Sequence, residues 1–181
     1  MASNITVGDK SFELLLSKEK IDGRIKEIAA EISSAHAGES VVFIIILKGS
    51  IFIAADLIRY CTLPSAIEVV RARSYVGTRS SGTVEIMMTD TLDLRGKTVI
   101  ILEDIVESGR TLQAVHHHLH QLKPAKLLTF SLLRKPKALL NPVHIDYVGF
   151  DIETAFVVGY GLDYDEMGRE LTDLYQVTSD K

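Results

Sequence analysis

Buried strands alternate with helical segments along this chain, and that alternation constrains its fold more than any other feature. Residues 41–47 form a continuous apolar, β-branched run, and further strands are expected at residues 67–73, 98–102 and 126–133. Such runs are typical of strands that are covered on both faces, as in a parallel sheet. The sequence therefore predicts an α/β fold with an open parallel core sheet flanked by helices.

The segments between these strands have helical or loop character. Apolar residues recur at helical spacing in residues 19–32, and further helices are expected at residues 51–61 and 110–122. Residues 74–82 are polar, contain two glycines and lack apolar periodicity, so we expect a long flexible loop. Residues 84–88 are its predicted returning arm.

The chain length predicts a single domain. With 181 residues and 46% hydrophobic content, the chain can bury one core and is too short for two ordinary domains. We expect a core from about residue 36 to 145. Residues 1–18 and 146–181, approximately, are expected to form a small hood over the carboxyl edge of the sheet, where ligands bind in such folds.

Composition excludes several other classes of protein. A formal net charge of -4 argues against a surface built for nucleic acid, which requires a concentrated positive field. Cys61 is the only cysteine, so no intrachain disulfide is possible, and we interpret it as a core residue in a reducing compartment. No stretch approaches the roughly 20 apolar residues that cross a bilayer. We therefore expect a cytoplasmic protein that binds neither membranes nor nucleic acid.

The most informative motif is residues 99–112, VIILEDIVESGRTL. A buried strand ends in two carboxylates, and a short turn with hydroxyls and a glycine opens a helix. The unpaired N–H groups and positive dipole of a helix start bind phosphate. Glu103 and Asp104 could accept hydrogen bonds from sugar hydroxyls or hold a hydrated Mg²⁺. Each element alone is common and is more often structural, but their adjacency favours a functional site. The glycine patterns of P-loop and dinucleotide enzymes are absent.

This motif resembles the phosphoribosyl-pyrophosphate signature of the type I phosphoribosyltransferases. Residues 47–50 (LKGS) resemble the pyrophosphate loop of that family, residues 73–75 (RSY) the start of its flexible lid, and residues 131–135 (SLLRK) its base-reading strand. Residues 156–164 (FVVGYGLDY) resemble the purine hood of the hypoxanthine-guanine phosphoribosyltransferases. The resemblance is thus specific to the 6-oxopurine branch.

The resemblance implies a Mg²⁺-dependent transfer of 5-phosphoribosyl from phosphoribosyl pyrophosphate to hypoxanthine or guanine, which gives IMP or GMP. It implies Glu107, Lys135 and Arg169 as catalytic residues. Magnesium would be held by Glu103, Asp104 and Asp163. The residues expected to contact the substrates are Lys48, Gly49, Ser74, Tyr75, Glu103, Asp104, Ile105, Glu107, Ser108, Gly109, Arg110, Thr111, Lys135, Phe156, Val157, Asp163 and Arg169.

Individual roles follow from the same resemblance. Residues 107–111 would bind the 5-phosphate, and Lys48 with Arg169 the pyrophosphate. Lys135 would donate to O6 of the base, and Phe156 would stack on its ring. An ammonium has no acceptor for an amino group, so a lysine at this place selects 6-oxopurines over 6-aminopurines.

The chain departs from the family pattern at Glu107, where the family usually has an aspartate proposed as the base that takes the N7 proton. The carboxylate is kept, but the extra methylene shifts it by about one bond length, which affects proton-transfer geometry. Our hypothesis is that Glu107 remains the general base.

Two rival functions stay open at the level of sequence. One is a regulatory protein that senses phosphoribosyl pyrophosphate and binds nucleic acid, although no helix-turn-helix extension or basic face is visible. The other is a phosphoribosyltransferase for xanthine or uracil, against which the hood sequence argues. The family resemblance also implies a homodimer or homotetramer.

Overall fold

The computed structural model describes residues 4–74, 84–88 and 93–178. Its core is a six-stranded sheet in the order β5-β4-β3-β6-β7-β8. All neighbouring strands are parallel except the β4–β5 pair, which is antiparallel. The strands are β3 (Val41–Leu47), β4 (Ser65–Ser74), β5 (Val84–Met88), β6 (Thr98–Val106), β7 (Lys126–Arg134) and β8 (Tyr147–Asp151). The predicted α/β fold with a mainly parallel core sheet is confirmed.

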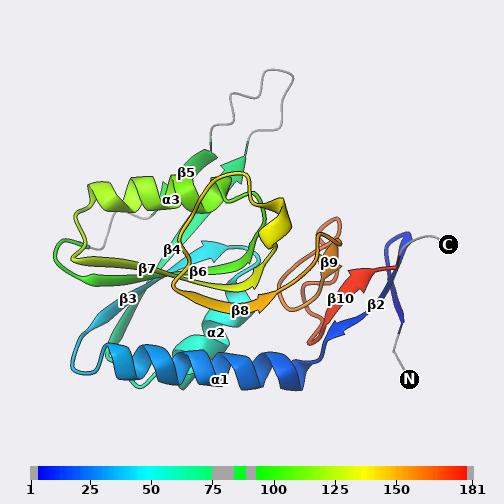
Figure 1. Cartoon of the computed structure of the whole chain (residues 1–181), viewed down its shortest axis with the longest axis horizontal. Coiled ribbons are helices and arrows are strands. Elements are labelled where there is room, and N and C mark those ends of the chain that lie inside the picture. Colours follow the sequence, from blue (N-terminus) through cyan, green and yellow to red (C-terminus); the bar gives the residue numbers. More distant parts are fainter. Residues whose placement is uncertain (1–3, 75–83, 89–92, 179–181) are drawn as a thin grey trace.

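Helices cover both faces of this sheet (Figure 1). Helices α1 (Lys18–Ala35) and α2 (Ile51–Tyr60) pack on one face, and α3 (Arg110–Gln121) packs on the other. The isoleucine stripe of α1, with its helical spacing, is fully buried in the first of these interfaces: Ile21, Ile25, Ile28 and Ile32. A short 3-10 helix, η1 (Pro136–Ala138), follows β7.

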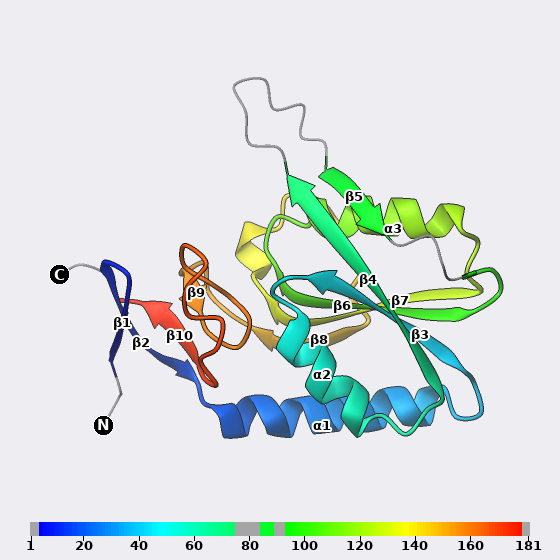
Figure 2. The same cartoon turned by 180° about the vertical axis from the view of Figure 1, so that it is seen from behind.

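A second sheet is built from the two ends of the chain. Its order is β1-β2-β10-β9, and its strands are β1 (Ile5–Val7), β2 (Lys10–Leu16), β9 (Val157–Val158) and β10 (Leu174–Val177). The pairings are antiparallel. Figures 1 and 2 show this sheet beside the carboxyl ends of the core strands. We call this sheet and the turns between β9 and β10 the hood.

The core extends further toward the carboxyl terminus than the boundary expected near residue 146. Strand β8 pairs with β7 in the core sheet, with Phe130 opposite Tyr147 and Arg134 opposite Asp151. Gly149 permits this close approach, because a Cβ at that position would lie 2.4 Å from the carbonyl oxygen of Leu132. The assignment of residues 147–151 to the hood is therefore corrected.

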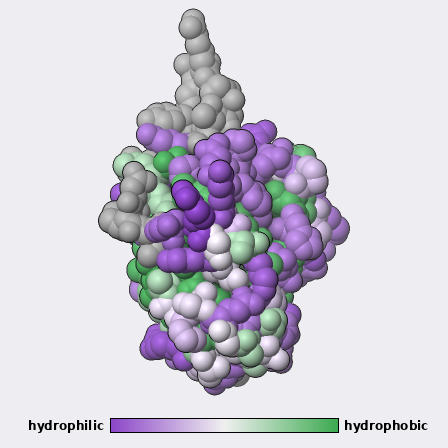
Figure 3. All heavy atoms as spheres, turned by 90° about the vertical axis from the view of Figure 1, so that its left-hand side faces the viewer, coloured by the Kyte–Doolittle hydropathy of each residue, from purple (hydrophilic) through white to green (hydrophobic). Residues whose placement is uncertain are grey.

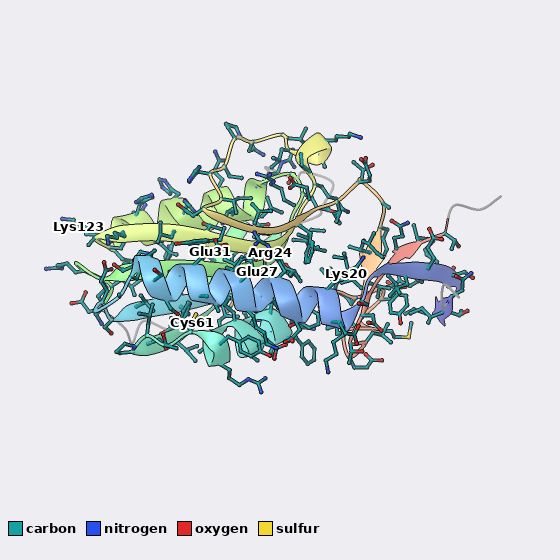
Figure 4. All side chains as sticks on the ribbon, turned by 60° about the horizontal axis from the view of Figure 1, so that its bottom comes forward. Lys20, Arg24, Glu27, Glu31, Cys61 and Lys123 are labelled. Atoms are coloured by element: carbon teal, nitrogen blue, oxygen red, sulfur yellow. The ribbon has the colours of Figure 1, made fainter. Side chains whose placement is uncertain are left out.

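Arg24 on α1 covers the exposed edge of β8 (Figure 4). Its guanidinium donates to the carbonyl oxygens of Val148 at 2.9 Å and Gly149 at 3.2 Å. The same group pairs with Glu27 at 2.9 Å and lies 3.7 Å from Glu31. An edge strand with free carbonyls is a template for unwanted pairing, so this contact both anchors α1 and protects the sheet.

Polar side chains join the amino ends of the core strands. Glu39 accepts hydrogen bonds from Lys126 at 2.6 Å and Thr98 at 2.7 Å, and it lies 3.3 Å from His36. Figure 3 shows this end of the molecule, where hydrophilic residues predominate. No helix among the described residues has the length and apolar character that crossing a membrane requires.

Candidate active site

The segments with functional motifs meet at the carboxyl edge of the core sheet. Strands β3, β6 and β7 run parallel, so the segments after Leu47, Val106 and Arg134 emerge on the same side. The hood lies at this edge (Figure 2). Topology therefore brings together the pyrophosphate-loop, phosphate-binding and base-reading motifs that are far apart in the sequence.

A pocket of about 150 Å³ lies at the start of α3. Its lining residues are Glu103, Ile105, Val106, Glu107, Ser108, Gly109, Arg110, Thr111 and Leu112. The N-cap residue of α3, Gly109, makes no side-chain capping hydrogen bond, and the N–H of Arg110 donates to Oγ of Ser108 at 3.4 Å. The first-turn N–H groups of a helix have no intrahelical acceptor, so they are available to an anion. This is the geometry of an anion site, and we call residues 107–111 the phosphate cradle.

Gly109 shapes the cradle. Its φ of +79° belongs to the left-handed region that favours glycine, and a Cβ there would lie 2.8 Å from the carbonyl oxygen of Asn141. Asn141 in turn braces the turn, since its backbone N–H and its side-chain amide both donate to the carbonyl of Ser108 at 3.1 Å.

The carboxylates of Glu103 and Asp104 lie near the carboxyl end of β6, shortly before the cradle in the sequence. Glu103 is buried, and its Oε2 has no hydrogen-bond partner among the described residues. Burial, and to a lesser extent the Asp104 carboxylate, raises the pKa of Glu103 well above its usual range. Burial also raises the pKa of Asp104 to about 6, opposed by backbone hydrogen bonds and by Arg169. A buried carboxylate oxygen without a partner among the described residues, such as Oε2 of Glu103, marks a place that a cation or hydroxyl donor can occupy.

The loop after β3 packs directly on these carboxylates. The Leu47–Lys48 peptide bond is cis, and a Cβ at Gly49 would lie 1.4 Å from Oδ2 of Asp104. Gly161 of the hood approaches from the other side, since its Cβ would lie 2.0 Å from the carbonyl oxygen of Gly49. Glycine at both positions lets the loop backbone contact the Asp104 carboxylate and the hood backbone at the same time.

Lys135 and Glu107 form an ion pair next to the cradle. Val106 pairs with Arg134 across β6 and β7, so the next residue on each strand lies beside the other. The backbone N–H of Lys135 also donates to the carbonyl of Val106 at 2.9 Å. The Lys135 side chain is only 4% exposed and the Glu107 side chain is 53% exposed, so the pair presents an acceptor at the pocket surface with an ammonium behind it.

The hood contributes a second charged group. Arg169 pairs with Asp163 at 2.7 Å and donates to the carbonyl of Gly161 at 2.9 Å. Val157 is buried in β9, whereas the Phe156 ring is 45% exposed and packs edge-on against Tyr164 with a centroid distance of 5.8 Å. The hood therefore offers a cation and a partly open aromatic face near the carboxyl edge.

Comparison with known proteins places this geometry in a family. The phosphoribosyl transferase domain profile matches residues 13–165. The hypoxanthine-guanine phosphoribosyltransferase of Aquifex aeolicus is 37% identical, over 93% of this chain and 96% of its own length. That of Mycobacterium tuberculosis is 42% identical, over 88% of this chain and 82% of its own length. The chain belongs to the phosphoribosyltransferase family.

Solved structures of phosphoribosyltransferases agree with this assignment. A hypoxanthine-guanine phosphoribosyltransferase from Bacillus anthracis has a TM-score of 0.84 and 36% identity, and the match covers 91% of this chain and 96% of that one. A hypoxanthine phosphoribosyltransferase from Staphylococcus aureus has a TM-score of 0.87 and 36% identity, over 92% and 91% of the two chains.

The phosphoribosyltransferase fold brings most of the predicted site residues to one edge. Ser74 is the last residue of β4, and the rest of the predicted loop, including Tyr75, lies outside the described residues. One residue that the sequence reading missed is Glu166, whose carboxylate contacts both Lys48 and Arg169. It lies just beyond the hood motif of residues 156–164, and no spacing rule in the sequence singles it out.

Proposed function

We propose that this chain is a purine salvage enzyme that transfers 5-phosphoribosyl from phosphoribosyl pyrophosphate to hypoxanthine or guanine. The products are IMP or GMP and pyrophosphate. The observation that carries the proposal is the Glu107–Lys135 pair beside the phosphate cradle. It combines a carboxylate acceptor and an ammonium donor at a phosphate site, in a chain similar to hypoxanthine-guanine phosphoribosyltransferases.

The cradle holds the 5-phosphate. Backbone N–H groups at the start of α3 and the hydroxyls of Ser108 and Thr111 donate to its oxygens. This contact orients the ribose so that C1′ faces the base and the ribose hydroxyls face the acidic pair. Positioning of this kind is a large part of the rate enhancement in group transfer.

Lys135 and Glu107 read the base and move its proton. Lys135 donates to O6 of the purine, while the bond between N9 and C1′ forms and the bond between C1′ and the pyrophosphate oxygen breaks. Glu107 takes the proton from N7. The pair separates when the base enters, because the ammonium and carboxylate each exchange their mutual contact for one to the purine.

Glu103 and Asp104 fit a hydrated Mg²⁺. The unpartnered Oε2 of Glu103 and the part-buried carboxylate of Asp104 supply the one or two carboxylates that Mg²⁺ uses, with the other ligands from water and substrate. When bound, Mg²⁺ supplies positive charge to the departing pyrophosphate. Asp163, paired with Arg169, is the candidate for a second ion.

Lys48, from the loop after β3, and Arg169, from the hood, bind the pyrophosphate together. Their charges stabilise the negative charge that develops on the leaving group. Ser74 and Tyr75 belong to the proposed lid, whose closure would exclude water from the reacting C1′.

A homodimer or homotetramer is the proposed assembly. Three large residues at the outer side of α2 remain exposed: Ile51 at 51%, Phe52 at 40% and Tyr60 at 38%. Exposed apolar side chains such as these are candidates for contacts between subunits. Light scattering of the purified chain checks this proposal, and the enzyme is expected in the cytoplasm.

The decisive experiment offers five bases side by side with Mg²⁺ and phosphoribosyl pyrophosphate. Hypoxanthine and guanine are expected to turn over, with adenine and uracil inactive and xanthine ranked by the same assay. If the protein binds phosphoribosyl pyrophosphate and converts none of the bases, the proposal is wrong and a sensor function replaces it.

A further inference from the structure

Glu166 holds together the two cations that would bind pyrophosphate. Its Oε2 accepts a hydrogen bond from Lys48 Nζ at 2.8 Å and another from Arg169 Nη2 at 3.2 Å. These two hydrogen bonds, first from Lys48 and then from Arg169, lower the pKa of Glu166, so it is an anion near neutral pH. One carboxylate oxygen thus lies where the positive charges of the loop and the hood converge.

A tight turn positions the backbone of Glu166. Tyr164 and Met167 exchange backbone hydrogen bonds at 2.9 and 3.0 Å, which makes Asp165 and Glu166 the central residues of a two-residue hairpin. Both have positive φ, 50° and 63°. Turns of this type favour glycine or asparagine, and a glutamate at the second position is uncommon. Glu166 thus stands at a position where the backbone favours glycine, which is a reason to seek a role for its side chain.

We propose that Glu166 is an internal competitor of pyrophosphate, which occupies the Lys48 and Arg169 charges in the free enzyme and returns to them when the product leaves. This inference rests on the proposed function, in which these two cations bind the leaving group. A carboxylate oxygen and a pyrophosphate oxygen cannot both lie at the point that the cations share, so entry of the substrate displaces Glu166.

A role for Glu166 that is limited to positioning Arg169 agrees less well with the contacts. Arg169 is already held by Asp163 at 2.7 Å and by the carbonyl of Gly161 at 2.9 Å, so it does not depend on Glu166 for its placement. The Glu166 and Lys48 side chains are 66% and 51% exposed. A contact at the solvent boundary is one that an incoming anion can replace without opening the core.

Binding of inorganic pyrophosphate in the presence of Mg²⁺, followed by calorimetry, tests the proposal in wild type, Glu166→Gln and Asp165→Asn. The first substitution removes the competing charge and keeps the size of the side chain. The second removes one negative charge from the same turn without touching the Lys48 or Arg169 contacts. From the strength of exposed ion pairs, we expect about a three- to tenfold lower Kd for Glu166→Gln and less than a twofold change for Asp165→Asn.

The outcomes separate this inference from the proposed function. An unchanged or higher Kd in Glu166→Gln would overturn the competitor role, as would equal gains in both variants, which indicate a general charge effect. Either result leaves turnover of hypoxanthine by wild type intact. If wild type binds neither pyrophosphate nor phosphoribosyl pyrophosphate, the proposed function fails, and the inference fails with it.

A kinetic measurement gives an independent readout. Pyrophosphate that competes with Glu166 leaves more slowly when that competitor is neutral, so inhibition by added pyrophosphate should strengthen by the same three- to tenfold factor in Glu166→Gln. The effect should shrink as ionic strength rises, because exposed charges are screened. Equal inhibition of wild type and variant at low salt would contradict the proposal.

Discussion

The ammonium of Lys135 and the carboxylate of Glu107 are paired at the ends of two adjacent parallel strands. The Lys135 side chain is 4% exposed and the Glu107 side chain is 53% exposed, so the carboxylate is accessible from the pocket while the ammonium is buried. A buried ammonium without a partner is costly, and the Glu107 carboxylate neutralises that of Lys135. The longer reach of glutamate compared with aspartate serves this contact, and it makes Glu107 the first residue to test.

Replacement of Glu107 by glutamine is expected to lower kcat by about a hundredfold or more, since general base catalysis typically contributes 10² to 10⁴. The side chain keeps its size, so KM for phosphoribosyl pyrophosphate should change little. Steady-state kinetics with hypoxanthine provide the measurement. The matched control is Glu107→Asp, which keeps the carboxylate and should retain most of the activity. A turnover number within a few-fold of wild type in Glu107→Gln would exclude Glu107 as the general base.

Replacement of Lys135 by glutamine tests selection of the 6-oxo group. An amide can accept a hydrogen bond from a 6-amino group, whereas an ammonium cannot. We expect kcat/KM for hypoxanthine to fall about a hundredfold and the adenine-to-hypoxanthine ratio to rise at least tenfold. Lys137→Gln is the control, because Lys137 is 71% exposed and pairs with Glu153. An unaltered adenine ratio in Lys135→Gln would assign base selection to other groups.

The core was predictable because its signals are local. The strand at Val41–Leu47 has the predicted bounds, and the isoleucines of α1 are buried as their spacing indicates. Burial on both faces forces a continuous apolar run, and burial on one helix face forces a 3.6-residue period. Neither depends on the rest of the chain. The motif at residues 99–112 was informative for the same reason, since strand, acids, turn and helix start are contiguous.

Features that depend on contacts between residues far apart in the sequence could not be predicted from it. Strand β8 is short, and only its contact with β7 across Gly149 assigns it to the core sheet. The Glu107–Lys135 pair depends on the register of β6 and β7, which no single segment encodes. Glu166 meets Lys48 through a turn with two positive φ values, and although Asp165 suits the first position of such a turn, Glu166 is uncommon at the second. The functions of these residues arise from tertiary contacts.

Asparagine at Asp104 is expected to stabilise the metal-free protein at pH 7.5. Burial raises the pKa of Asp104 from 3.8 to about 6, so the folded state favours the protonated form. The stabilisation associated with that proton is present at low pH and is lost as pH rises from about 4 to about 6. Because the carboxylate is only part-buried, we expect a gain of about 1 to 2 kcal/mol, or roughly 3 to 6 °C in Tm.

Thermal unfolding at pH 7.5 and pH 4, with and without Mg²⁺, checks this prediction. The gain should be smaller at pH 4, and Mg²⁺ should raise the Tm of wild type more than that of Asp104→Asn. Asp151→Asn is a control of opposite sign, because a hydrogen bond from Arg134 lowers the pKa of Asp151. A lower Tm for Asp104→Asn at pH 7.5 would show that the carboxylate stabilises the fold.

Glu39 is expected to govern part of the acid stability of the protein from the far end of the sheet. Hydrogen bonds from Lys126 and then from Thr98 lower the pKa of Glu39 from 4.5 to about 2. A depressed pKa means that the unfolded state binds the proton more tightly. The contribution to folding is therefore complete above about pH 4.5 and is lost as pH falls toward about 2.

Glutamine at Glu39 removes this titration while it keeps the shape of the side chain. The difference in Tm between wild type and Glu39→Gln should be largest near neutral pH and should narrow steadily below pH 4.5. Glu153→Gln serves as the control, because the Glu153–Lys137 pair is exposed on both sides and should contribute little at any pH. A difference that stays constant from pH 7 to pH 3 would mean that packing of the Glu39 side chain, and not its charge, joins the amino ends of the core strands.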